Sequence, residues 1–280
     1  MTTRGRSSFA VAGGVLAGGI VAGGAAAAAA PAVAALQPVR RALTPRVLPD
    51  RLSGISPAHH VALTFDDGPD PASTPAFLEL LAAYDVRATF FLLGRYAARE
   101  PALVRRMAEA GHELAVHGWT HRCVARVGPR RLLVDLQATR RVVEERSGTQ
   151  VRWYRPPYGV LTTPALVAAR AAGLHTVLWS DWGVDWRRGR TPAQVITTLT
   201  RGLRPGATVL LHDTDRTSAP GSWRTTLAAT EQLLDLLAAR RLPAGPLREH
   251  WPAVERGRDR PWLPRPGPSL SGSARVSPVP

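Results

Sequence analysis

Short apolar runs alternate with longer, helix-like stretches through the middle of this chain, and this alternation restricts the fold more than any other feature. Apolar runs bounded by turn residues are typical of buried strands, whereas longer stretches with a helical period are typical of helices. The expected strands are residues 60–65, 88–93, 113–116, 151–154, 175–179 and 208–211. The expected helices are residues 74–84, 101–110, 129–147, 164–172, 192–203 and 223–240. This order predicts an α/β fold with a parallel sheet, open or closed into a barrel.

Composition divides the 280 residues into four segments. Residues 1–35 start with arginines, continue as an Ala/Gly-rich apolar run and end on small residues, a pattern typical of an export signal peptide. The run is about as long as a membrane span, so an uncleaved N-terminal anchor is the alternative. Residues 36–58 are expected to be a linker, 59–241 a single folded domain, and 242–280 a Pro/Arg-rich, partly disordered extension. We therefore expect a secreted or extracytoplasmic protein.

The formal charge of +15 favours anionic partners. Cell-wall polymers and an anionic membrane surface both fit, the latter through peripheral or N-terminal association. Nucleic acid is not expected, because no aromatic-and-basic repeat and no helix-turn-helix pattern is present. Cys123 is the one cysteine, which excludes an internal disulfide and a multi-cysteine zinc site. We expect a monomer.

Reactive side chains follow five of the expected strands. In parallel α/β folds, active sites collect at the C-terminal ends of the strands. The five clusters are Asp66 with Asp67, His117 with His121, Arg155, Asp185 with Trp186, and His212. Their shared position predicts one site rather than scattered surface residues.

The adjacent carboxylates of Asp66 and Asp67 predict a positive partner, because two buried carboxylates repel each other. A divalent metal is the expected partner, with one carboxylate binding it and the other exchanging protons. The alternative for Asp66 is a helix cap or turn residue ahead of Gly68 and Pro69.

Two histidines four residues apart, His117 and His121, can bind one metal ion, since a helical turn would place both rings on one face. The alternative is a pair of solvated or structurally satisfied loop histidines. Together with Asp67 they give three protein ligands and leave a position for water, as in catalytic metal sites. Mixed nitrogen and oxygen ligands favour Zn²⁺, with Co²⁺, Ni²⁺ or Mn²⁺ as alternatives.

Five short motifs lie at these strand ends in a fixed order. They are TFDDGP at 64–69, the pair His117 and His121, RPPY at 155–158, Asp185-Trp186, and LLH at 210–212. In this order they resemble the motifs of polysaccharide deacetylases, carbohydrate esterase family four, and the resemblance covers residues 59–240. It implies a distorted (β/α) barrel of about seven repeats. It also implies metal-dependent removal of N-acetyl or O-acetyl groups from polysaccharides, so that residues 59–241 would be the catalytic domain.

The resemblance implies a catalytic role for several residues. Asp66 resembles the general base, and Arg155 the residue that pairs with it. Asp67, His117 and His121 resemble the metal ligands. His212 resembles the general acid, and Asp185 the carboxylate that orients it.

The substrate-binding residues are implied in the same way. Tyr158 resembles the residue whose backbone N–H helps hold the oxyanion. Trp186 and Leu210 resemble the walls of the acetyl-binding pocket. Asp213 and Asp215, which fit no motif, are expected on a solvated loop near His212, and the alternative is that they assist His212.

Two positions depart from the family pattern. Gly118 stands where the family usually has Ser or Thr, whose hydroxyl can brace the ligand loop, so this loop should be less rigid and bind metal less tightly. Trp182 stands where the family usually has Asp, three places before Asp185, with Asp181 one residue earlier. The extra aromatic ring suggests a sugar-stacking surface or a tighter pocket, and we expect Trp182 to line the acceptor groove for the sugar.

The expected function is a metal-dependent hydrolase of linear amides that removes N-acetyl groups from N-acetylglucosamine units of a cell-wall or extracellular glycan. Peptidoglycan or a chitin-like oligomer is the expected substrate. The alternatives are an O-acetyl esterase of the same fold acting on xylan, and a noncatalytic wall-binding protein. A serine hydrolase is disfavoured, because the chain has no Gly-x-Ser-x-Gly motif.

Overall fold

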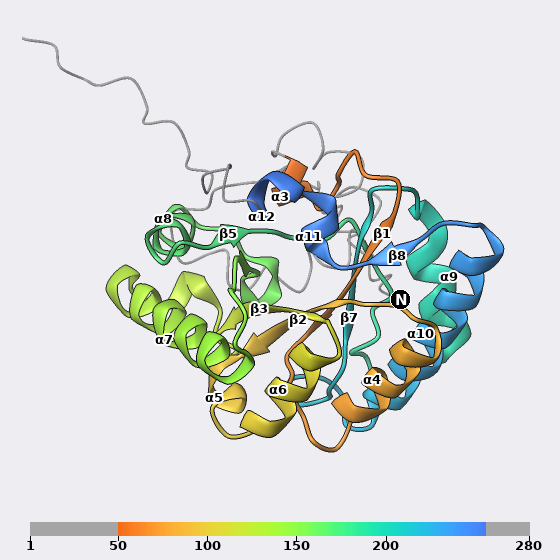
Figure 1. The fold of residues 1–280 in the computed structure, drawn as a ribbon, viewed down its shortest axis with the longest axis horizontal. Helices are drawn as coiled ribbons and strands as arrows, with labels where there is room; N and C mark the ends of the chain where they lie inside the picture. The colour runs from red at the N-terminus through yellow and green to blue at the C-terminus, as the bar shows by residue number, and fades with distance from the viewer. Residues whose placement is uncertain (1–49, 256–280) are drawn as a thin grey trace, which may run out of the picture.

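A curled parallel β-sheet forms the centre of the computed structural model, which describes residues 50–255 (Figure 1). Its strand order is β5-β4-β3-β2-β1-β7-β6, and β8 pairs with the start of β1. All of these pairs are parallel. The strands are β1 Val61–Asp66, β2 Thr89–Leu93, β3 Glu113–Gly118, β4 Trp153–Tyr154, β5 His175–Thr176, β6 Asp181–Trp182, β7 Thr208–His212 and β8 Ala244–Gly245. The predicted α/β fold is confirmed, as a distorted and incompletely closed barrel.

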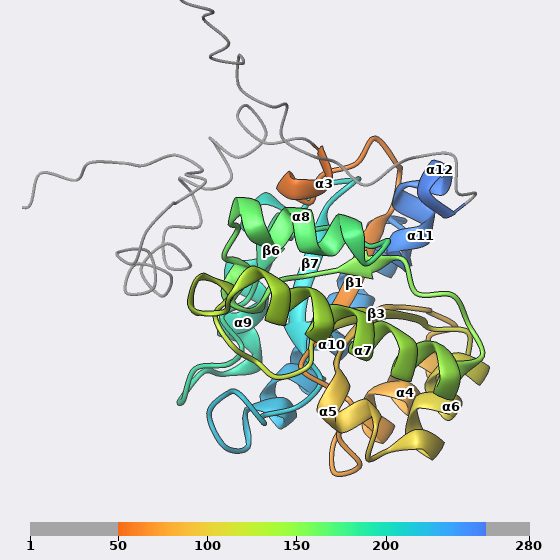
Figure 2. The same ribbon diagram turned by 90° about the vertical axis from the view of Figure 1, so that its left-hand side faces the viewer.

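Helices surround the sheet (Figures 1 and 2). The longer helices are α4 Thr74–Ala83, α6 Pro101–Glu109, α7 Pro129–Ser147, α8 Thr163–Ala171, α9 Pro192–Leu199 and α10 Ser222–Ala239. Each overlaps an expected helix. The short ones are α3 Asp50–Ser53, α5 Gly94–Ala97, α11 Leu247–His250, α12 Pro252–Glu255 and the 3₁₀ turns η1 Val124–Arg126, η2 Pro157–Gly159 and η3 Thr200–Gly202. Proline in the first turn starts α6 and α7, where its missing N–H and fixed φ carry no cost.

The central strands are buried along their whole length, as expected of a parallel sheet covered by helices. Phe65 of β1 stacks on Phe90 of β2 at 5.1 Å between ring centroids and meets Phe77 of α4 edge-on at 5.2 Å. This packing fixes the end of β1 immediately before the two carboxylates of Asp66 and Asp67.

The expected strand at 175–179 is shorter in the structure. β5 ends at Thr176, and the chain crosses to the other edge of the sheet, where the two-residue strand β6 pairs with β7. Two backbone bonds hold the crossing segment: Leu178 N–H donates to the carbonyl of Arg51, and Ser180 N–H donates to that of Thr208. β6 could not be recognised in the sequence, because a strand of two residues is too short to show an alternating pattern.

The folded unit extends beyond residues 59–241 at both ends. Leu52 of α3 is buried, β8 pairs with Val61 and Ala62 of β1, and Leu247 of α11 is buried. Leu247 and Val254 belong to an apolar cluster with Ala62 of β1, and the carbonyl of Gly54, just after α3, accepts a hydrogen bond from the N–H of Thr208 in β7. Figures 1 and 2 show α11 and α12 side by side, with α3 at the same end of the molecule but apart from them.

The expected signal peptide or anchor at 1–35, most of the linker at 36–58 and the end of the extension at 242–280 lie outside the described residues. Within residues 50–255, no helix has both the length and the apolar character needed to cross a bilayer.

Candidate active site

The carboxyl ends of the strands bring most of the predicted site residues together. Asp66 ends β1, His117 lies near the end of β3 and His212 ends β7. Arg155 follows β4 directly. The strands are parallel, so their C-terminal ends all lie at the same end of the sheet. Residues far apart in the chain therefore meet here.

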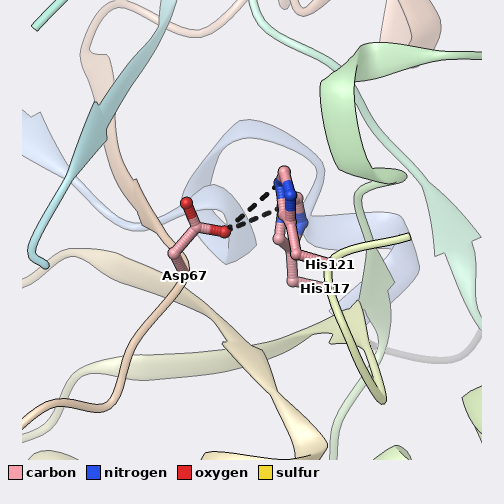
Figure 3. Close-up of side chains that lie close together, drawn as sticks. All are labelled: Asp67, His117 and His121. Atoms are coloured by element: carbon pink, nitrogen blue, oxygen red, sulfur yellow. Dashed lines mark ion pairs between the residues drawn. The ribbon is translucent and has the colours of Figure 1, made fainter. Parts of the chain in front are cut away.

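Asp67, His117 and His121 form a candidate metal centre (Figure 3). The Oδ1 atom of Asp67 lies 3.4 Å from Nε2 of His117 and 3.5 Å from Nε2 of His121. One ligand atom from each residue lies within 4.8 Å of the others. The helical turn expected for the two histidines is wrong: His117 belongs to a strand and His121 to the loop after it. The two imidazoles nevertheless face the same carboxylate oxygen.

The chemistry of this centre fits a divalent cation. Asp67 Oδ1 is buried and accepts no hydrogen bond from any described residue. The carbonyl oxygen of Arg155 lies 2.8 Å from Nδ1 of His117, so that Nδ1–H donates and Nε2 keeps its lone pair toward the centre. Burial lowers the pKa of His117 to about 3, which keeps the ring neutral. An unpartnered buried carboxylate oxygen beside a neutral imidazole is the donor set that a metal ion completes.

The loop that carries these ligands has an unusual backbone. Asp67 has a φ of 82°, a region that side chains other than glycine seldom adopt and that recurs at functional sites. Gly118 has a φ of +104°, so a Ser or Thr there would be strained. The carbonyl of Trp119 accepts a 3.1 Å hydrogen bond from the N–H of Arg95, which holds the start of the His121 loop against α5.

Asp66 forms a buried ion pair with Arg155. Nη1 of Arg155 donates to Oδ1 of Asp66 at 2.7 Å and also to the hydroxyl of Thr64 at 2.8 Å. The guanidinium lies 4.0 Å from the ring centroid of Phe91. Burial raises the pKa of Asp66, and the charge of Arg155 opposes this rise. Burial thus makes Asp66 a stronger proton acceptor, while Arg155 favours its charged form. Both properties suit a general base.

His212 forms a second pair, with Asp185. The carboxylate of Asp185 lies 3.2 Å from Nδ1 of His212, accepts the backbone N–H of His212 at 2.9 Å and accepts the hydroxyl of Thr226 at 3.0 Å. Burial alone would lower the pKa of His212, but the Asp185 carboxylate outweighs it and raises the pKa to about 9. His212 is thus an imidazolium at neutral pH, with Nε2 3.8 Å from Oδ2 of Asp67.

Two of the expected substrate-binding side chains border this centre. The ring of Tyr158, which is half exposed, meets His121 edge-on at 4.4 Å, and the Tyr158 backbone has a φ of 61°. The ring of Trp186 lies 5.5 Å from that of His212. Leu210 is buried in the apolar cluster against which Trp186 packs. Their contacts with a substrate stay predictions.

The expectation that Trp182 lines a sugar groove is wrong. Its side chain is fully buried in β6 and packs edge-on against Trp179 at 6.3 Å, in a cluster with Leu178 and Leu210. A buried ring cannot stack on a sugar. The error follows from the missed strand, because β6 directs this side chain into the interior.

Three polar residues near the site were not predicted. Asp213, expected on a solvated loop, is buried and accepts a hydrogen bond from Thr74; burial raises its pKa to about 7. Its place directly after His212 at a strand end was a usable signal. The hydroxyl of Thr217 donates to Oδ2 of Asp67, and that of Thr226 to Asp185, but neither threonine belongs to a motif.

Known proteins are similar to this chain over the part that carries most of the site. The polysaccharide deacetylase family model matches residues 53–177. A chitooligosaccharide deacetylase of Bradyrhizobium sp. is 39% identical over 160 residues, which span 57% of this chain and 73% of that protein. A peptidoglycan-N-acetylglucosamine deacetylase of Listeria monocytogenes is 35% identical over 159 residues, 57% of this chain and 33% of that protein.

Among solved structures, a CE4 family pseudoenzyme from Bacillus anthracis is similar with a TM-score of 0.63. It is 27% identical, over 70% of this chain and 66% of that chain. The residues matched by the family model include the candidate metal ligands and the Asp66–Arg155 pair, whereas Asp185 and His212 follow them in the chain.

Proposed function

Because this chain belongs to the polysaccharide deacetylase family, we propose that it is a metal-dependent hydrolase that removes N-acetyl groups from N-acetylglucosamine units of a cell-wall or extracellular glycan. One observation supports this proposal above the others. Two ion pairs border the Asp67–His117–His121 centre: the carboxylate of Asp66 with Arg155, and the imidazolium of His212 with Asp185. The first suits a general base and the second a general acid, the two groups that amide hydrolysis requires.

Asp67, His117 and His121 would hold the metal, with Zn²⁺ favoured by the mixed ligands and Co²⁺, Ni²⁺ or Mn²⁺ as alternatives. When bound, the ion would polarise the acetyl carbonyl and lower the pKa of a coordinated water to roughly 7. His117 is oriented for metal binding, because the Arg155 carbonyl fixes its ring and burial keeps the ring neutral.

Asp66 would accept the proton of the attacking water. Its carboxylate is ready for this role because Arg155 favours the charged form, while burial raises its proton affinity. A general base of this kind contributes roughly 10²–10⁴-fold to the rate. Arg155 in turn is held by the Leu178 carbonyl and the Thr64 hydroxyl, so that the pair keeps one geometry.

His212 would donate a proton to the leaving nitrogen, since an amine leaves poorly unless it is protonated. Asp185 keeps His212 charged and fixes the orientation of its ring. The backbone N–H of Tyr158 would help hold the oxyanion, a contribution of roughly 3 kcal/mol for one such donor. Trp186 and Leu210, which belong to one apolar cluster, would face the acetyl methyl.

The substrate that we propose is peptidoglycan or a chitin-like oligomer, in line with the names of the relatives from Listeria and Bradyrhizobium. Export or N-terminal anchoring would place the enzyme beside such a polymer; this part of the proposal depends on residues 1–35. The similarity to a pseudoenzyme makes a noncatalytic protein the necessary alternative. Against it, the candidate base, acid and three ligands are present together.

Acetate release from a panel of acetylated glycans tests the proposal. N-acetylglucosamine oligomers and peptidoglycan should be deacetylated, chelation should abolish release, and adding back one of the four metals should restore it. Asp66→Asn should still bind metal but release acetate roughly 10²–10⁴-fold more slowly. Faster release from acetylated xylan would favour the O-acetyl esterase, and no release from any glycan with metal bound would favour the noncatalytic protein.

A further inference from the structure

We infer that Thr217 is a positioning residue that fixes the carboxylate of Asp67, so that Oδ1 and not Oδ2 faces the two histidines. Thr217 lies in the loop between β7 and α10 and belongs to none of the motifs. The inference rests on the metal centre of the proposed function, but it concerns metal binding and not the identity of the glycan.

The two oxygens of Asp67 have different surroundings. Oδ1 faces Nε2 of His117 and of His121 and accepts no hydrogen bond from the described part of the chain. Oδ2 accepts the hydroxyl proton of Thr217. Figure 3 shows one oxygen directed at the imidazoles and the other directed away. Rotation about the last bond of an aspartate is only weakly restricted, so a hydrogen bond to one oxygen decides which oxygen is presented.

Water is a poor substitute for this hydroxyl. Asp67 is fully buried, so solvent cannot readily replace a lost donor at Oδ2. Nε2 of His212, the candidate acid, also lies 3.8 Å from Oδ2. Loss of the Thr217 hydroxyl would therefore free the carboxylate to turn toward the acid and away from the metal centre.

The loop that carries Thr217 is itself held in place. Nε of the neighbouring Arg216 donates to Oδ2 of Asp70 at 2.9 Å, and the hydroxyl of Thr214 donates to the same oxygen at 2.7 Å. The Arg216 guanidinium lies 3.9 Å from the ring centroid of Tyr96. These contacts connect the segments that follow β1, β2 and β7. We call them the Arg216 clamp, and they fix the backbone from which Thr217 reaches Asp67.

The alternative is that Thr217 is a surface threonine with an incidental hydrogen bond, since the residue is exposed. Thr217→Val separates the two, because it keeps the shape and removes the hydroxyl. Outer hydrogen-bond partners of metal ligands typically contribute about 10–100-fold to metal affinity or activity. We expect a loss of this size in Zn²⁺ affinity for Thr217→Val and near-complete recovery in Thr217→Ser.

The measurement is titration of the metal-free full-length protein with Zn²⁺ against a competing chelator, without substrate. Thr197→Val, at an exposed threonine of α9, is the matched control and should bind Zn²⁺ like the wild type. Co²⁺ spectra should also change in Thr217→Val, because they report the arrangement of the ligands. Wild-type Zn²⁺ affinity and an unchanged Co²⁺ spectrum in Thr217→Val, with an unchanged melting temperature, would overturn the inference.

A double-mutant cycle tests whether the clamp acts through Thr217. Arg216→Gln should weaken Zn²⁺ binding when introduced into the wild type. In the Thr217→Val background it should cause little further loss of Zn²⁺ affinity. Fully additive losses would show that the Arg216 clamp does not act through this hydroxyl. Failure of the proposed function has a different signature, because a protein that releases no acetate can still show the Thr217 effect on Zn²⁺ affinity.

Discussion

At the scale of residues, two adjacent carboxylates have separate environments. Asp66 pairs with Arg155, whereas Asp67 presents one oxygen to two histidines. Successive side chains along a strand point to different sides, and Asp67 follows the end of β1 with a left-handed backbone. One short sequence can therefore supply both a candidate base and a candidate metal ligand.

Asp185→Asn should move the alkaline limb of the pH–rate profile to lower pH. The pKa of His212 is raised to about 9, so its acid form is present at neutral pH and is lost as the pH rises through that value. Removing the charge of Asp185 lowers this pKa, and the active form is then lost earlier. The measurement is kcat against pH for both proteins.

Thr226→Val is a milder change that serves as the control. It removes a hydrogen bond to Asp185 but leaves the charge of the Asp185 carboxylate in place. It should move the alkaline limb less than Asp185→Asn does. An alkaline limb that stays in place in Asp185→Asn would show that His212 does not supply the limiting proton.

At the scale of elements, the last described segment completes the sheet. β8 pairs with β1, and α11 buries His250 beside His60 at 4.3 Å between ring centroids. Nε2 of His250 lies 3.2 Å from the carbonyl oxygen of His60, which requires a proton on that nitrogen. This segment stabilises the end of the sheet opposite the site, by packing and by hydrogen bonds from the two imidazoles to backbone carbonyls.

Acid should weaken the packing of α11. Burial lowers the pKa of His250 to about 3, whereas the unfolded chain titrates near its ordinary value of 6.5. Between these values the unfolded state binds the extra proton, so stability is lost as the pH falls below about 6.5. The effect should be on the order of a few kcal/mol in the free energy of unfolding, measured by denaturant titration.

His250→Gln should reduce this pH dependence, because it keeps a donor and removes the titrating group. His60→Gln is the partner control, since the pKa of His60 is also lowered, mainly by burial. If the pH dependence of unfolding is the same in His250→Gln and the wild type, His250 is not the cause of the acid sensitivity.

The long elements could be predicted from the sequence, whereas the two-residue strands β6 and β8 could not. The run before Asp66 and the proline start of α7 both carry their signals locally, and the predicted limits of α7 agree with the structure. β6 and β8 have two residues each and form because neighbouring strands offer backbone partners. The burial of Trp182 follows from β6, and the contact of Thr217 with Asp67 depends on a fold that brings distant residues together.

At the scale of the whole molecule, a basic protein carries its candidate catalytic centre at one end of the sheet. The formal charge is +15, and an anionic polymer should therefore be attracted over distances longer than any single contact. Such long-range attraction is screened by salt, with a Debye length of about 8 Å at physiological ionic strength.

Deacetylation of intact cell wall should fall as salt rises, while deacetylation of a small neutral N-acetylglucosamine oligomer should stay nearly constant. Acetate release from both substrates across a salt series is the measurement. Equal salt dependence for the two would show that charge attraction to the polymer does not contribute, and that any effect of salt acts on the site itself.

The central claim is that Asp67, His117 and His121 hold one divalent metal ion, and diffraction from zinc-soaked crystals at the zinc absorption edge tests it most directly. The account predicts one anomalous peak in contact with Asp67 Oδ1 and with Nε2 of both histidines, absent from Asp67→Ala crystals. A zinc-soaked crystal with no peak there, and with the three side chains turned away from one another, would contradict it.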